Sequence, residues 1–183
     1  MIQSAPIERV ADPRDTASTK AFLSSHRAMA VCTREFARLS DELVSAAKVF
    51  AMNNSDESPV VRQSPDRCIV QVGPVALTVA WLRNGNDSPA EGQLLAIVWI
   101  GNIAPRGEHL PERLHARRAM PTPLAAWEES FVVSASSEAT WHWHPENLTR
   151  EGYESAELAA RCIDRLQIEH AKLSAVSIGA REQ

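Results

Sequence analysis

The 183-residue chain contains little of the material from which several common functional sites are built. Its seven glycines leave little for a glycine-rich loop that cradles phosphate. The sequence holds no G-x-S-x-G elbow, P-loop, G-x-G-x-x-G turn, H-E-x-x-H helix or EF-hand loop. No local motif therefore names a reaction.

Cysteine is also scarce, and its spacing argues against two further kinds of site. Cys32, Cys68 and Cys162 are odd in number, widely separated and without a C-x-x-C pair. This pattern is typical of reduced, buried thiols rather than of a disulfide framework or a zinc site. The first residues lack both the basic and the apolar region of a secretory signal. We therefore expect a cytoplasmic protein.

Long apolar runs and an excess of positive charge are missing too. No apolar run approaches the roughly 18 to 20 residues that span a bilayer, so we expect no membrane partner. The net charge of −4 gives no general attraction to nucleic acid, which we also do not expect as a partner. With 44% hydrophobic and 23% charged residues, the composition is ordinary for one globular domain.

What the chain does contain is a central stretch of strand-like segments, from Cys68 to His144, that holds all five tryptophans. Between Val75 and Leu82 large apolar residues alternate with mostly small ones, which predicts a strand with one buried face. Between Gln93 and Ile103 both faces are apolar, which is typical of a central strand. We predict that the larger faces of these two strands pack under a long helix: Leu77, Val79, Trp81, Leu95, Ile97 and Trp99.

That long helix is predicted from Thr16 to Met52, where bulky apolar residues recur at intervals of seven: Phe22, Met29, Phe36, Leu43 and Phe50. Small residues follow three positions after most of them, which favours close packing over a sheet and leaves a weak seam for a coiled coil. Self-association through the helix stays open as the alternative. A helix of about 37 residues would span about 55 Å, more than a small sheet covers, so we expect a homodimer.

The helical period returns from Ser155 to Val176 through Leu158, Cys162 and Leu166. The whole pattern predicts an α+β fold, in which an antiparallel sheet of about five strands carries the long N-terminal helix and the C-terminal helix mainly on one face. We expect a flexible arm over residues 1–15, a single domain over 16–176 and a tail over 177–183. A proline- and arginine-rich insertion over 104–127 would interrupt the sheet, with a short helix over 111–118.

The sharpest local feature is Trp141-His142-Trp143-His144, where strand alternation puts both indoles on one face and both imidazoles on the other. Two histidines spaced in this way can ligate one metal ion, but a third ligand is needed. The candidates for that ligand are His109, His115, Glu138 and Cys68. An outer strand face with inward tryptophans is the alternative, and we assign neither a metal nor a cofactor. His170 reads as a hydrogen-bonded core histidine on the last helix.

A second feature is the group of arginines in the insertion, Arg113, Arg117 and Arg118, which could share one helical surface and receive a carboxylate or a phosphate. A solvated helix surface is the alternative explanation. If the domain has a functional pocket, we expect it between the insertion and the strand that carries His142 and His144, because long ordered insertions often carry function.

The order of elements, a long helix, three strands, a short helix, two strands and a helix, is similar to that of type III secretion chaperones. That resemblance implies a small, acidic, dimeric protein that binds unfolded protein partners. We therefore expect a non-enzymatic interaction or assembly protein of adaptor or chaperone kind, which uses the sheet face or the long helix for a protein partner or for self-association. The alternative is a small-ligand- or metal-binding enzyme with a pocket near His142, His144 and the insertion.

Overall fold

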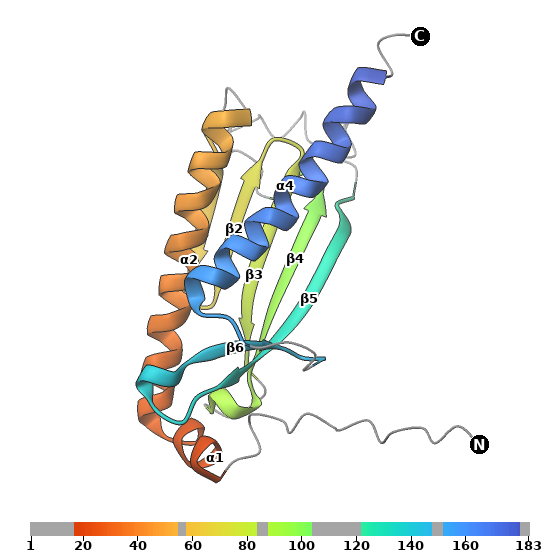
Figure 1. Cartoon of the computed structure of the whole chain (residues 1–183). Coiled ribbons are helices and arrows are strands. Elements are labelled where there is room, and N and C mark those ends of the chain that lie inside the picture. Colours follow the sequence, from red (N-terminus) through yellow and green to blue (C-terminus); the bar gives the residue numbers. More distant parts are fainter. Residues whose placement is uncertain (1–16, 55–57, 84–87, 104–121, 148–151, 180–183) are drawn as a thin grey trace, which may run out of the picture.

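The structure is a computed structural model that describes residues 17–54, 58–83, 88–103, 122–147 and 152–179, with side chains described up to residue 175. Six strands form one sheet, and two long helices, α2 (His26–Asn54) and α4 (Ser155–Gly179), lie side by side across the same face of it (Figure 1). The predicted α+β class, with a long N-terminal helix and a C-terminal helix on an antiparallel sheet, is confirmed. Within the described part, no helix combines the length and apolar character of a membrane span.

The predicted long helix is divided into α1 (Ala17–Leu23) and α2 (His26–Asn54). The division falls at Ser24 and Ser25. The hydroxyl of Ser25 accepts a hydrogen bond from the backbone N–H of Ala28 at 3.2 Å, so Ser25 caps the new helix. The prediction of one unbroken helix from Thr16 was wrong, because the chain leaves the helix at Ser24 and Ser25 and begins a second one.

The six strands follow one another across the sheet in chain order, and every neighbouring pair is antiparallel. Gly73 allows the tight turn between β2 and β3 by adopting a positive φ of 54°, which suits a residue without a Cβ. The predicted count of about five strands was one short. The strands are β1 (Val60–Ser64), β2 (Arg67–Val72), β3 (Val75–Leu82), β4 (Gln93–Ile100), β5 (Leu124–Ser134) and β6 (His142–Pro145).

The inward face of β4 is the opposite of the one that we predicted. In the sheet, Leu77 pairs with Val98 and Trp81 with Leu94, so these residues share the face beneath the helices. That face of β4 is completely buried, with Leu94, Ala96 and Val98 all at 0% exposure. The larger residues of β4 lie half-buried on the other face, away from α2 and α4: Leu95, Ile97 and Trp99.

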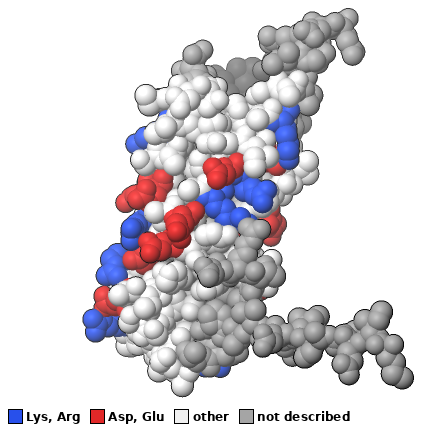
Figure 2. All heavy atoms as spheres, in the orientation of Figure 1, with Lys and Arg blue, Asp and Glu red and all other residues white. Residues whose placement is uncertain are grey.

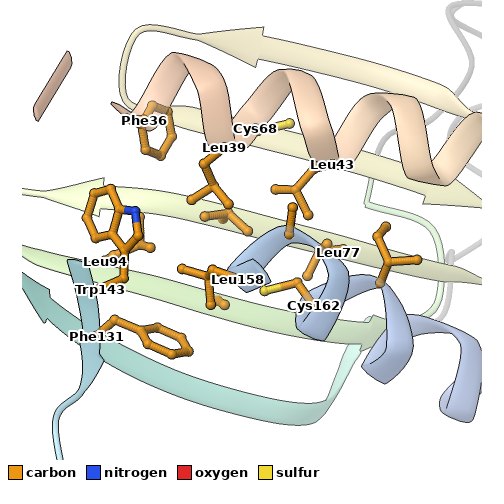
Figure 3. Packing of buried hydrophobic residues seen from close by; sticks show 14 of the residues in the cluster. Phe36, Leu39, Leu43, Cys68, Leu77, Leu94, Phe131, Trp143, Leu158 and Cys162 are labelled. Atoms are coloured by element: carbon orange, nitrogen blue, oxygen red, sulfur yellow. The ribbon is translucent and has the colours of Figure 1, made fainter. Parts of the chain in front are cut away.

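The core lies between the inner face of the sheet and the two helices. The C-terminal helix α4 (Ser155–Gly179) lies over β3 and β4, whereas α2 lies over β2. Figure 3 shows Phe36 and Leu43 of α2 and Leu158 of α4 pointing toward the strands. The predicted burial of Leu77, Val79 and Trp81 is confirmed.

The start of β5 shortens the predicted insertion, because residues 124–127 belong to the strand. At the end of β4, Gly101 has a φ of 118° and approaches Pro123 so closely that a Cβ would lie 3.1 Å from the Cα of that proline. The short helix predicted over 111–118 and the arm predicted over 1–15 lie outside the described residues.

Gln71 fastens the turn after β2 to the end of β4. Its side-chain nitrogen lies within hydrogen-bonding distance of the carbonyl oxygens of Gly73, Val75 and Gly101, at 2.8, 3.1 and 3.2 Å. Its side-chain oxygen accepts a hydrogen bond from the backbone N–H of Ile103 at 3.0 Å. We expect Gln71→Leu to lower the free energy of unfolding by about 2 kcal/mol, because buried backbone groups lose their partner. Urea unfolding measures the change.

The matched control is Gln63→Leu, at an exposed position of β1, which should change the stability by less than about 0.5 kcal/mol. If the two substitutions change the free energy of unfolding equally, the hydrogen bonds of the Gln71 amide do not contribute to stability.

Candidate functional site

The strand that carries the predicted tryptophan and histidine site is β6. Trp141 and Trp143 point into the core, at 6% and 0% exposure, and the imidazoles of His142 and His144 are half-buried on the other face. The two imidazole rings lie 6.3 Å apart between centroids. The predicted alternation along this segment is confirmed, and the strand presents its histidines as a pair.

The backbone of Gly152 covers this histidine pair. A Cβ at Gly152 would lie 2.5 Å from Nε2 of His144 and 2.7 Å from Cβ of His142, so the chain passes directly against both residues. A ring nitrogen of His142, Nδ1, lies 3.1 Å from the carbonyl oxygen of Thr140. Local chain contacts therefore occupy much of the space that a ligand at these imidazoles would need.

Two candidates for a third metal ligand, Glu138 and Cys68, make other contacts. The carboxylate of Glu138 pairs with Arg27 and Arg34 of α2, and these cations hold its pKa below the usual range. Cys68 points into the core from the inner face of β2. Among the residues that the structure describes, no group of three or more His, Cys, Asp and Glu side chains is placed to hold a metal ion.

The other predicted binding residues, Arg113, Arg117 and Arg118, lie outside the described residues, as do His109 and His115. The pocket predicted between the insertion and β6 therefore stays a prediction, and with it the enzyme alternative. What the structure does show is that the indoles of this candidate site belong to the core.

Those indoles form a packed cluster that joins both helices to the sheet. Trp143 meets Trp81 and Trp141 edge to face, each at 5.7 Å between ring centroids. The indole N–H of Trp143 donates to the hydroxyl of Ser155 at 3.1 Å, and that hydroxyl donates to a carboxylate oxygen of Glu35 at 3.0 Å. The start of α4 is thereby tied to α2 and to β6.

The three cysteines belong to the core between the helices and the sheet. All are buried free thiols, and burial raises the pKa of Cys32 and Cys162 to about 12 and that of Cys68 to about 11. A thiolate is the form that attacks electrophiles or binds metal, and at neutral pH these groups stay protonated. Their predicted role as buried, reduced core residues is confirmed.

A hollow of about 940 Å³ lies between α2 and α4, toward their C-terminal ends. We call it the α2–α4 groove. The two helices diverge toward this end of the sheet (Figure 1), and the groove is open to solvent along their surface. Its lining consists of Ala46, Val49, Phe50, Asn53, Asn54, Ala160, Ile163, Asp164, Gln167, His170, Ala171 and Ser174.

The chemistry of the groove is mixed and almost uncharged. Counting histidine as neutral, Asp164 is the one lining residue with a full charge, and the rest are alanines, larger apolar residues, amides and a serine. His170 meets Phe50 edge to face at 5.3 Å between ring centroids. Instead of the hydrogen-bonded core position that we predicted, this histidine is half-buried in the wall of the groove.

Figure 2 shows the same contrast over the helix surface. Charged side chains gather over its middle and lower parts, whereas the end at which α2 finishes is mainly uncharged. Val49 at 59% and Met52 at 83% are large apolar residues exposed on α2 at this end, and Ile168 at 43% is exposed on α4. The sequence could not reveal the groove, because it depends on how two helices more than a hundred residues apart diverge.

Charged residues elsewhere on α4 are used to hold the sheet. Arg161 donates two hydrogen bonds from one guanidinium nitrogen and one from another to the carboxylate of Glu129 in β5, at 2.7 to 3.0 Å. The guanidinium of Arg161 also lies over the ring of Tyr153, and that of Arg165 over Trp127. Through Glu129 and Trp127, these two arginines link α4 to β5.

Comparison with known proteins adds no family to these observations. No protein-family model matches the chain, and neither the curated proteins nor the solved structures give a significant match.

Proposed function

We propose that this chain is a non-enzymatic protein-binding or assembly protein, of adaptor or chaperone kind, and that its α2–α4 groove receives an amphipathic helix of a partner protein. The observation that carries the proposal is an open groove of about 940 Å³ between two helices, with large apolar side chains exposed beside it. Helix-in-groove recognition uses such a surface, with anchors one and two turns apart on the incoming helix.

The lining of the groove suits a helix better than a small metabolite. The lining includes three small side chains, those of Ala46, Ala160 and Ala171. Because they are small, the backbone of an incoming helix can approach closely. A metabolite site usually encloses its ligand and brings several polar groups toward one point. Here the polar groups are distributed along an open channel, and Asp164 is the only full charge.

The length of α2 favours the same kind of partner. Its 29 residues span about 44 Å, whereas the eight residues of β3 span about 27 Å, so one helix cannot be covered by the sheet along its whole length. Val49 and Met52, which are exposed near the C-terminal end of α2, would gain from contact with a protein surface. Self-association, expected from the same excess of length, would present a second copy at this surface and is distinguished by the experiment below.

We place this function in the cytoplasm. The support is the set of free, buried thiols at Cys32, Cys68 and Cys162, since proteins of oxidising compartments more commonly use their cysteines in disulfides.

Site-specific crosslinking tests the groove. A photo-crosslinking amino acid at Ala171, inside the groove, is compared with the same amino acid at Ala37, which is exposed on the opposite side of α2. We expect position 171 to capture one main protein through a segment with apolar residues at helical spacing, and position 37 not to capture it. Mass spectrometry of the crosslinked peptides identifies that segment.

Groove-blocking variants then measure the contribution of the groove. Ala160→Arg and Ala171→Arg replace exposed residues, so stability should change by less than about 0.5 kcal/mol while binding of the captured segment weakens by about 1 to 3 kcal/mol. Ala37→Arg is the matched control and should leave binding unchanged. Equal capture at both positions, capture of a second copy only, or unchanged binding in both groove variants would each overturn the proposal.

A further inference from the structure

Half of strand β5 has a free edge. The strand pairs with β4 over Leu124–Phe131, but β6 pairs with it only over Phe131–Ser134. On the side away from β4, residues 124–129 therefore have no strand beside them among the described residues. Such an edge presents backbone N–H and C=O groups that can pair with another extended chain.

The direction of these backbone groups follows from the hydrogen bond just beyond β6. The N–H of Glu146 donates to the carbonyl oxygen of Ser130 at 2.9 Å, so Ser130 turns its backbone groups toward the β6 side. Because alternate residues of an antiparallel strand turn the same way, Glu128 also directs its N–H and C=O to that side. There β6 has already ended, and no described strand replaces it.

A notch lies at the place where an added strand would continue the line of β6. Its volume is about 410 Å³, and its lining comprises Glu128, Glu129, Ser130, Pro145, Glu146 and Asn147. The carboxylate of Glu129 is held by Arg161 on the helix-covered face. Glu128 and Glu146 are exposed, and in the described part of the chain neither makes an ion pair; Glu146 accepts one hydrogen bond, from the side-chain nitrogen of Gln93 at 2.8 Å.

We propose that this edge binds an extended segment of a partner protein, which pairs with β5 through its backbone and places a lysine or arginine between Glu128 and Glu146. The charge of the notch selects this occupant. A second copy that paired through the same edge would add its own Glu128 and Glu146 to the notch, and like charges side by side on a sheet disfavour pairing. A cation supplies the charge that the two exposed carboxylates lack.

A β-bulge in the same edge of β5 limits pairing with other extended chains. Val98 pairs with Trp127 and Trp99 with Ala125, so Ala126 is an extra residue that forms a bulge in β5. A bulge shortens the regular ladder available to an incoming strand, as bulges do at many sheet edges. The short ladder requires an additional attraction, and the carboxylates provide it for basic segments.

The probe is a synthetic extended peptide of about eight residues that alternates valine with lysine, compared with the same peptide carrying glutamate instead of lysine. Titration into the ¹⁵N-labelled full chain should shift the amide signals of residues 124–130, and the lysine peptide should bind at least about tenfold more tightly. A lysine peptide with N-methylated backbone amides should lose binding, because it cannot pair as a strand. Glu128→Gln with Glu146→Gln should reduce the preference for lysine to less than about threefold.

Two controls make the result decisive. Glu42→Gln removes an exposed carboxylate on α2 and should leave the preference intact. Hydrogen exchange of the chain alone should show the amide of Glu128 exchanging rapidly. Protection of that amide without peptide would show an edge already occupied, by a second copy or by another part of the chain, and would overturn the proposal. Signals that shift elsewhere, or equal binding of the N-methylated peptide, would overturn it as well.

Discussion

Replacing Phe36 with Ala is expected to lower the free energy of unfolding by about 3 to 5 kcal/mol, the usual cost of removing a buried aromatic ring. Phe36 is 2% exposed in the core between α2 and the sheet. Its ring fills space that neither α2 nor the strands can close by moving, because α2 is also held to α4 through Glu35 and Ser155. The truncation therefore leaves a cavity rather than a collapsed contact.

Denaturant unfolding followed by tryptophan fluorescence measures this loss, since Trp81 and Trp143 are buried in the same core. Met52→Ala is the control on the same helix. Met52 is 83% exposed, and its truncation should change stability by less than about 0.5 kcal/mol. A loss of stability below about 1 kcal/mol for Phe36→Ala would show that Phe36 is not a core residue.

Periodicity predicted the orientation of those elements whose two faces differ in the size of their apolar residues. Along β3 the large residues Leu77, Val79 and Trp81 alternate with small ones, and the structure turns the large face toward the core beneath the helices. The prediction of a single buried face was wrong, because Ala76 and Ala80 on the other face are buried as well. The seven-residue spacing of Phe36, Leu43 and Phe50 likewise identified the buried stripe of α2. In both cases one face carries the bulkier apolar residues, and the pattern indicates which side faces the core between helices and sheet.

The same reasoning was wrong for β4, because both of its faces are apolar. The pairing register with β3 decides the matter, and it turns Leu94, Ala96 and Val98 toward the helices. Small residues at Ala96 and Val98 suit the close approach of α4, which lies over β3 and β4. For β4, side-chain size was therefore the wrong criterion, because the pairing register with β3 fixes which face lies beneath the helices.

The candidate sites were still harder to infer from the sequence, because they depend on long-range geometry. The alternation of Trp141 to His144 was predicted, but the contact of Gly152 with both imidazoles depends on how the chain returns after β6. The free edge of β5 follows from a difference in the lengths of two strands, and the α2–α4 groove from the divergence of two helices. None of these has a local signature in composition or spacing.

A methyl group at Gly92 is expected to cost about 3 kcal/mol of stability through overpacking. A Cβ built at Gly92 would lie 2.1 Å from Cζ2, 2.6 Å from Cη2 and 2.9 Å from Cε2 of Trp81. The backbone of Gly92, with φ −79° and ψ 157°, is one that any residue can adopt, so the expected cost comes from the clash alone. Trp81 cannot readily move aside, because it is 6% exposed and packs against Trp143.

A double-mutant cycle isolates this clash. Trp81→Phe removes the outer part of the indole that the new methyl group would meet. In that background Gly92→Ala should cost less than about 1 kcal/mol, so the coupling between the two positions should reach about 2 kcal/mol. Urea unfolding of the two single variants, the double variant and the unmodified chain supplies the four free energies. If the two losses simply add, the cost at Gly92 does not come from Trp81. The methyl group would then disturb the turn from Pro89 to Gly92 instead. In that turn the N–H of Gly92 donates a hydrogen bond to the carbonyl oxygen of Pro89 at 3.2 Å.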